Sequence, residues 1–301
     1  MLNELIVMNP EVQQAFVAKK PIVALESTII SHGMPWPRNA ETAKMVEDIV
    51  RNEGAVPATI AIRDGKLLVG LTNEDIEFLG KEKGVWKVSL RDIPYVVSQK
   101  LPGATTVAAT MRIASMAGIK IFATGGIGGV HRGAENSMDI SADLTEMSQT
   151  DVAVVSAGVK SILDIGLTLE YLETMGIPVV TVGQDEFPSF YSQKSGFDSP
   201  LRLDSPEDIA AMLNLKWQMG LKGSVLIAQP LPTDKEVSHE IIDEHIHLAL
   251  VEAEKQQIKG KLVTPFLLKY IANRSQGESL EANIALIMAN AKLAARIVVK
   301  M

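Results

Sequence analysis

The chain has 301 residues, of which 47% are hydrophobic and 22% are charged, and its formal net charge is −7. This acidic balance offers no basic surface to a nucleic-acid backbone, and the lack of cysteine excludes disulfides and thiolate metal sites. Because no apolar run approaches the ~18 residues of a membrane span and the acidic N-terminal region has no signal-peptide pattern, we expect a cytoplasmic protein with neither membrane nor nucleic-acid partners.

Short apolar runs alternate with amphipathic segments from residue 21 to residue 230. The runs predict strands at 21–27, 84–90, 119–129, 151–158, 177–183 and 223–230, the third of which continues into a glycine loop. A β-hairpin is predicted at 56–72 with its turn at Asp64-Gly65. Helices are predicted at 38–54, 73–83 with Asn73 as N-cap, 103–118, 161–175 and 206–219; an irregular segment is expected at 184–203, and an almost wholly helical region after Pro232.

This alternation of strands and helices predicts a three-layer α/β/α fold with a mainly parallel, mixed central sheet and a helical C-terminal region. No internal repeat or linker divides the chain, so residues 1–301 are expected to form a single domain. Ligands of such folds collect at the carboxyl ends of the strands. Polar clusters follow the predicted strands at 26–32, 125–143, 156–160 and 184–191, and a site is therefore expected there.

The richest of these clusters is ATGGIGGVHRGAENSMDISADL at 123–144. Four glycines after a strand permit positive φ and a close approach of backbone N–H groups to an anion, so they indicate either a tight structural turn or a phosphate-binding loop. Asp139 and Asp143, with Ser137 and Ser141 beside them, could hold a hydrated divalent cation or could cap helices. Without cysteine, a metal here is more typically Mg²⁺ or Mn²⁺ than Zn²⁺.

Two single residues carry possible catalytic chemistry. Lys160 follows an apolar strand, where partial desolvation would favour a neutral amine able to form an imine with a sugar carbonyl. The alternative is an ordinary lysine whose charge reaches solvent. Glu26, at the end of another apolar strand, could be a general acid in water-poor surroundings, or a carboxylate that only accepts backbone hydrogen bonds.

Further candidates are less distinctive. Lys87 and Arg91 could meet a phosphate or could be ordinary surface charges. His32 and His131 lie in loops, where histidine more often provides structural hydrogen bonds than catalysis. Asn283, on a predicted helix, could reach a nucleobase edge through its amide or could face solvent.

Six stretches in this order resemble one family. They are ALESTIISHGMPWPRN, KVSLRDIP, GATTVAATM, FATGGIGGVHRGAENSMDISADL, VVSAGVKSILDIGLTLEYLET and GQDEFPSFY. Together they resemble the pseudouridine-5'-phosphate glycosidases, also called indigoidine-synthase-A-like proteins, over about residues 21–294. The resemblance implies reversible cleavage of the C–C glycosidic bond of pseudouridine 5'-phosphate to uracil and ribose 5-phosphate. It also implies a divalent metal, usually Mn²⁺ with Mg²⁺ or another cation possible, and a homotrimer.

The resemblance assigns roles to particular positions. It implies that Glu26 is the proton donor, that Lys160 is the nucleophile and that Asp139 binds the metal. The substrate-binding positions that it implies are Lys87, Val107, Ser141, Ala142 and Asp143.

The reaction explains why an amine is needed beside the acid. Oxygen glycosidases use two carboxylates because the leaving group is an oxygen that can be protonated. A C–C bond has no such oxygen, so an imine between Lys160 and the ring-opened ribose would let uracil leave as a carbon group, with Glu26 as the source of its proton. Two other readings stay open, a Schiff-base aldolase acting on another phosphorylated sugar and a non-catalytic binding protein that retains the phosphate site.

Overall fold

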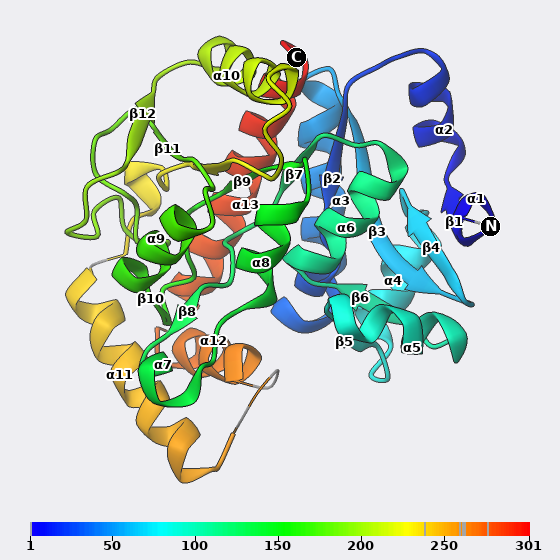
Figure 1. The fold of residues 1–301 in the computed structure, drawn as a ribbon. Coiled ribbons are helices and arrows are strands. Elements are labelled where there is room, and N and C mark those ends of the chain that lie inside the picture. Colours follow the sequence, from blue (N-terminus) through cyan, green and yellow to red (C-terminus); the bar gives the residue numbers. More distant parts are fainter. Residues whose placement is uncertain (1, 238, 259, 261–262, 276) are drawn as a thin grey trace.

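The computed structural model describes residues 2–237, 239–258, 260, 263–275 and 277–301. Within these residues, eleven strands form one sheet (Figure 1). Its main path runs β1 (Ile6–Met8), β4 (Lys66–Val69), β3 (Val56–Arg63), β2 (Ile22–Leu25), β7 (Ile121–Ala123), β9 (Ala153–Ser156), β13 (Leu226–Ala228), β11 (Val179–Val182) and β12 (Leu201–Leu203). Off this path, β6 (Gly103–Thr105) pairs with β3 and with β5 (Trp86–Val88), and β8 (Val130–His131) forms a separate antiparallel pair with β10 (Leu163–Asp164).

The middle of the sheet is parallel and buried on both faces. Ala24, Phe122, Val154, Leu226 and Val179 form one continuous row across β2, β7, β9, β13 and β11. All five side chains are buried, as expected for parallel strands covered by helices on both sides. The predicted mainly parallel sheet is confirmed, and the carboxyl ends of β2, β7 and β9 lie at the same edge of the sheet.

Strand β3 belongs to both parts of the sheet. Its first half pairs in parallel with β2, at 56–59. Its second half pairs with β4 through the predicted hairpin, whose turn residues Asp64 and Gly65 have φ of 52° and 75°. On the edge of β3 that β2 has left, β6 pairs antiparallel with Ala61 and Ile62. The sheet therefore divides where β2 ends and β6 begins.

Two hydroxyl groups form hydrogen bonds at the point where the sheet divides. Ser27 Oγ and Thr105 Oγ1 both donate to the Ile60 carbonyl, at 2.6 and 2.7 Å, and the Thr105 N–H donates to Ser27 Oγ at 2.9 Å. The carbonyl that neither strand pairs is thereby satisfied in a buried position. As a result, Glu26 and Thr106, the neighbours of these two residues, lie at the opening between the strands.

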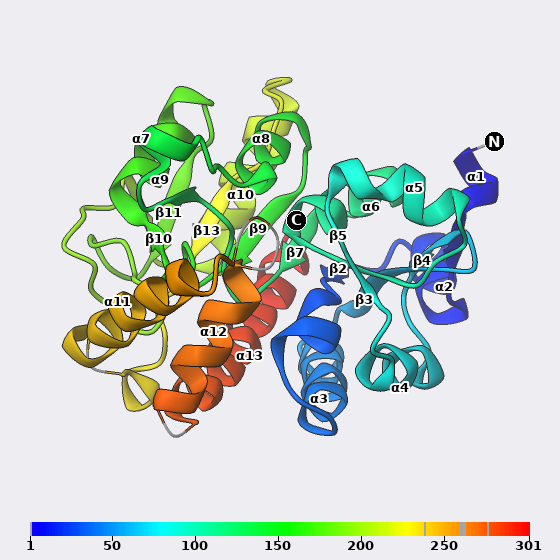
Figure 2. The ribbon, with the colours of Figure 1, turned by 90° about the horizontal axis from the view of Figure 1, so that it is seen from below.

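Helices cover both faces of the sheet, as Figure 2 shows. On one face lie α6 (Val107–Ala117) and α8 (Ala142–Gln149); on the other lie α3 (Arg38–Asn52) and α13 (Glu278–Val298), with α10 (Pro206–Gln218) packed on α13. The predicted α/β/α layers and helical C-terminal region are thus confirmed. The other α-helices are α1 (Leu2–Leu5), α2 (Pro10–Val17), α4 (Asn73–Lys81), α5 (Ile93–Ser98), α7 (Ala134–Ser137), α9 (Ile165–Thr174), α11 (His239–Lys255) and α12 (Val263–Arg274). In the described part of the chain, no helix has the length and apolar character to cross a membrane.

Two predicted helix starts and one predicted helix cap were wrong. The helix predicted from residue 103 begins at Val107, because Gly103–Thr105 pairs as strand β6. The helix predicted from residue 161 begins at Ile165, after the short strand β10.

In α4 the cap is Thr72 and not Asn73. The Thr72 hydroxyl accepts the Asp75 N–H, and the Asp75 carboxylate accepts the Thr72 N–H. This reciprocal pair satisfies two backbone donors, whereas an Asn73 cap would satisfy one.

Candidate active site

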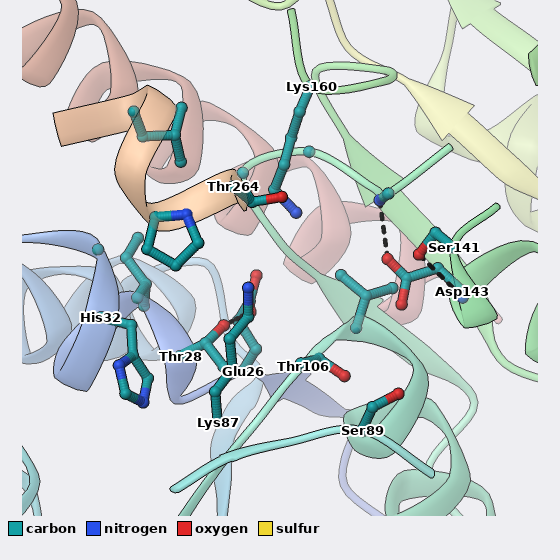
Figure 3. A pocket seen from close by; sticks show the side chains of 18 of the residues that line it. Glu26, Thr28, His32, Lys87, Ser89, Thr106, Ser141, Asp143, Lys160 and Thr264 are labelled. Atoms are coloured by element: carbon teal, nitrogen blue, oxygen red, sulfur yellow. Dashed lines mark hydrogen bonds between the residues drawn. The ribbon is translucent and has the colours of Figure 1, made fainter. Parts of the chain in front are cut away.

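A cavity of about 220 Å³ opens at the carboxyl ends of β2, β7 and β9, as the fold class predicted. The cavity (Figure 3) is lined by most of the residues singled out in the sequence, namely Glu26, His32, Lys87, Arg91, Val107, His131, Ser141, Asp143, Lys160 and Asn283. Asp139 and Ala142 are not among its lining residues. Lys160 enters it from one side, and Glu26 and Lys87 enter it from the opposite side.

Glu26 is held by two hydroxyls. Thr28 donates to Oε2 and Thr124 donates to Oε1, so each carboxylate oxygen accepts one hydrogen bond. Thr28 belongs to the same turn as Glu26, while Thr124 follows the neighbouring strand β7. The carboxylate is therefore fixed in orientation yet retains lone pairs for further partners. Its partners are side chains, and not the backbone groups of the alternative reading.

Lys160 lies four residues after β9, beyond the strand end that the sequence suggested. Its N–H donates to the Ile127 carbonyl at 3.1 Å, and its carbonyl accepts the Leu163 N–H at 3.0 Å. Both bonds fasten the backbone, whereas the side chain extends into the cavity (Figure 3). Among the residues that the structure describes, no acceptor pairs with its amino group. Lys160 therefore points into the cavity, and does not reach out to bulk solvent.

Positive charge faces the cavity from β5. Lys87, on this strand, is close enough to His131 for its charge to act on the imidazole. Burial lowers the pKa of His131; the Asp139 carboxylate, whose Oδ2 lies 4.0 Å from Nδ1, opposes this shift, and Lys87 adds to it. The imidazole therefore favours its neutral form, and Lys87 is a main cation on this wall.

The glycine loop after β7 is a packed structural turn. None of the four residues Gly125, Gly126, Gly128 and Gly129 has a positive φ, so the expected reason for glycine was wrong. The reason is close approach, because a Cβ on Gly128 would lie 2.2 Å from Ser141 Oγ and one on Gly126 would lie 2.5 Å from the Phe190 ring. The Ile127 and Gly128 N–H groups already donate to protein acceptors, so these two are not open to a phosphate.

Asp143 joins two parts of the site. Its Oδ1 accepts the Ala108 N–H at 2.9 Å, in the first turn of α6, and its Oδ2 accepts the Gly128 N–H at 2.7 Å. The side chain is buried, and its own N–H donates to Ser141 Oγ at 3.2 Å. Both carboxylate oxygens are thus engaged with backbone donors, which favours a positioning role over metal binding.

The start of α6 brings one more polar group to the cavity. Val107 is buried at the first position of this helix, and the N-cap residue Thr106 lines the cavity beside it. The Thr106 hydroxyl oxygen is buried and has no hydrogen-bond partner among the described residues. A ligand oxygen would satisfy this hydroxyl.

Asp139 is suited to be one ligand of a cation that keeps most of its water. Its side chain is 46% exposed, and its carbonyl accepts the His131 N–H at 3.0 Å. Within the described residues, no group of three or more histidine, aspartate or glutamate side chains could enclose a metal. A hard cation that keeps most of its water, such as Mg²⁺ or Mn²⁺, is the kind that a single exposed carboxylate suits.

Asn283 faces the cavity from α13, which excludes the solvent-facing alternative. Two turns further along the same helix, Asn290 is buried and donates to the carbonyls of Thr124 and Gly125 at 2.7 and 3.3 Å. The C-terminal helix therefore both holds the end of β7 and presents an amide to the ligand.

Several lining residues were missed from the sequence. They are Thr28, Ser89, Asp92, Thr106, Phe190, Thr264, Pro265 and Leu268. The last three come from α12, more than a hundred residues after Lys160, where helical periodicity gives no sign of a ligand. Nothing in the sequence marked Phe190. Its unusual backbone conformation, with a φ of 68°, is visible only in the structure.

Comparisons of sequence extend over nearly the whole chain. A family model described as indigoidine synthase A like protein matches residues 11–300. A protein named pseudouridine-5'-phosphate glycosidase from Geobacillus kaustophilus is 59% identical, with 98% of this chain and 98% of the relative aligned. Another of the same name from Clostridium botulinum is 55% identical, with 100% of this chain and 98% of the relative aligned.

Comparisons of structure also cover nearly the whole chain. The prealnumycin C-glycosynthase AlnA, solved in complex with ribulose 5-phosphate, superposes with a TM-score of 0.91 at 39% identity, over 99% of this chain and 97% of that chain. An indigoidine synthase A-like protein from Thermotoga maritima superposes with a TM-score of 0.90 at 37% identity, over 98% and 96%. The likeness therefore includes the whole fold.

Proposed function

The chain belongs to the family of indigoidine synthase A-like proteins, and on this premise we propose that it is a pseudouridine-5'-phosphate glycosidase. The reaction is the reversible cleavage of the C–C glycosidic bond of pseudouridine 5'-phosphate, which gives uracil and ribose 5-phosphate. The names of the relatives support the reaction, and the C-glycosynthase solved with a pentulose phosphate supports the class of substrate.

The observation that carries the proposal is that Glu26 and Lys160 face one cavity from opposite sides. A carboxyl group and an amine are the two groups that cleavage at carbon needs. The Lys160 amine forms a bond to the anomeric carbon, the bond from that carbon to the ring oxygen breaks, and the ring oxygen takes up the proton that the nitrogen loses, so the ribose opens. The nitrogen lone pair then forms the imine while the C–C bond breaks, and its electrons stay on uracil C5.

Glu26 delivers the proton that C5 takes up. Its orientation by Thr28 and Thr124 aims the carboxyl group without use of the substrate. Water then hydrolyses the imine, releases ribose 5-phosphate and restores the Lys160 amine. In the reverse direction the same carboxylate removes the proton from C5.

The phosphate meets Lys87 in this proposal. Ser89 and Thr106 line the same part of the cavity, and the unpartnered Thr106 hydroxyl is a donor for a phosphate oxygen. Asn283 takes the uracil edge, because its amide can both donate and accept. Ser141 and Asp143 shape the wall beside the phosphate.

A divalent cation completes the proposed site. Asp139 would hold Mn²⁺, or Mg²⁺ or another divalent cation, mainly through waters, beside His131 and close to the phosphate end of the cavity. When bound, the cation supplies positive charge that offsets the charge of the phosphate. Family membership is also the basis for proposing a single domain over residues 1–301, a homotrimer and a cytoplasmic location.

The test is direct. Purified protein is incubated with pseudouridine 5'-phosphate and Mn²⁺, and uracil release is followed by chromatography, with a chelated sample as control. Metal-dependent release of uracil is the expected result. No release with any divalent cation would contradict the proposal, and release of a triose phosphate from another sugar phosphate would indicate a Schiff-base aldolase.

A further inference from the structure

A second, smaller cavity adjoins the active-site cavity at Glu26. It has a volume of about 30 Å³ and shares Glu26, Ile29, Gly125 and Ile287 with the active-site cavity. The minimum for one water molecule is about 10–15 Å³ on the same measure. The small cavity therefore has room for one or two waters.

The wall of this cavity carries an unsatisfied polar group. Thr42, on α3, is 1% exposed, and its hydroxyl oxygen has no hydrogen-bond partner among the described residues. A buried hydroxyl without a partner destabilises the folded state, and a threonine inside a helix usually avoids this by bonding to its own backbone. Thr42 lines the small cavity together with Glu26, so both residues border the same space.

We infer that the small cavity holds a water molecule that links Thr42 to Glu26, and that Thr42 is a positioning residue for the acid of the proposed glycosidase. The Thr42 hydroxyl donates to the water, and the water donates to the Glu26 carboxylate. Thr59 also lines the cavity; its hydroxyl donates to Glu47 at 2.6 Å and retains lone pairs for the second hydrogen of the water. Three polar partners are the usual number for a buried water.

This water completes the support of Glu26. Thr28 and Thr124 each occupy one site on the carboxylate oxygens, which leaves one face toward the substrate and one toward the small cavity. The water anchors the rear face, so that rotation of the carboxyl group is resisted from three directions. Thr42 thus affects the orientation of the acid without touching the substrate, and its loss should reduce kcat while KM is kept.

The test compares three single variants. Thr42→Val keeps the shape and removes the hydroxyl, Thr42→Ser restores a hydroxyl, and Thr181→Val is the matched control. Thr181 is also buried with an unpartnered hydroxyl, but it lies on β11, four strands away from β2, and lines neither cavity. We expect kcat for uracil release to fall about tenfold in Thr42→Val with KM unchanged, to recover in Thr42→Ser, and to stay at the wild-type value in Thr181→Val.

Two readouts do not depend on the proposed function. Thr42→Val should lower Tm by about 2–4 °C because a hydrated hydroxyl is lost, whereas Thr181→Val should leave Tm equal or raise it. A crystal structure of the wild-type protein should show a water between Thr42 and Glu26. A dry cavity, or a Thr42→Val protein with wild-type kcat and Tm, would overturn the inference. If the wild-type protein released no uracil, the proposed function would fail, while Tm and the crystal structure would still decide the water site.

Discussion

Thr124 donates a hydrogen bond to the carboxylate of Glu26, although 98 positions separate the two residues in the chain. The bond exists because β2 and β7 are neighbours in the parallel sheet, with Leu25 opposite Ala123, so the residues that follow both strands meet. The acid of the proposed reaction is therefore oriented by the register of the sheet.

Replacement of Thr124 by valine tests this orientation. The side chain is buried and valine fills nearly the same volume, so the fold should persist. We expect kcat to fall about tenfold with little change in KM, because the misaligned carboxyl group binds no less substrate but transfers its proton less well. Steady-state kinetics with pseudouridine 5'-phosphate measure both constants, and an unchanged kcat would show that Thr124 does not orient the acid.

Lys87 is predicted to recognise the phosphate. Lys87→Met should raise KM about 10–100-fold, the size of a lost hydrogen bond to a charged group. With unphosphorylated pseudouridine, the variant and the wild type should have equal, weak activity. Lys66→Met is a matched control, because Lys66 lies on strand β4 of the same sheet, which does not pair with β5, and donates to the Glu4 carbonyl outside the cavity. A similar loss for both substrates would instead place Lys87 in the chemistry.

Asp143 is predicted to stabilise the fold of the site. In Asp143→Asn, one of the two backbone donors, from Ala108 or Gly128, would face an amide N–H₂ group. The free energy of unfolding should fall by about 1–3 kcal/mol, which is the cost of a buried donor without a partner. Urea titration followed by circular dichroism measures this change. Unaltered stability with lost activity would mean that Asp143 acts on the substrate alone.

Asp139 is predicted to act through the metal. Because its carboxylate is substantially exposed, Asp139→Asn should leave the free energy of unfolding within about 0.5 kcal/mol of the wild type. The Mn²⁺ concentration that gives half-maximal uracil release should rise at least about tenfold. A titration of both proteins from the chelated state measures this shift, and identical metal curves would exclude Asp139 as a ligand.

The parts of the site that were predicted from the sequence are those that lie in contiguous segments. Glu26 and Lys160 each follow an apolar run, and the rule that ligands bind at the carboxyl ends of parallel strands placed both at one edge. The layers of helix and sheet were predicted for the same reason, because the hydrophobic period within each segment indicates whether it is a strand or a helix. The wrong helix starts occurred where short strands, β6 and β10, depend on partners elsewhere in the chain.

The remaining parts depend on distant contacts that no local pattern records. The bond from Thr124 to Glu26 requires the register of two strands, and the position of Thr264 requires the packing of α12 over the cavity. The glycines of the loop were recognised, but their reason was not, because close approach to Ser141 and Phe190 is a tertiary property. The unpartnered hydroxyl of Thr42 lies inside a regular amphipathic helix, where its sequence position is unremarkable.

The proposed mechanism requires that Lys160 forms an imine with the sugar at the site that Glu26 serves. The most direct test is to incubate the protein with ribose 5-phosphate and a borohydride reductant, and to map the modified peptide by mass spectrometry. We expect one reduced phosphosugar adduct, on Lys160, and no adduct and no uracil release in Lys160→Arg. An adduct on another lysine, or near wild-type turnover by Lys160→Arg, would contradict this mechanism.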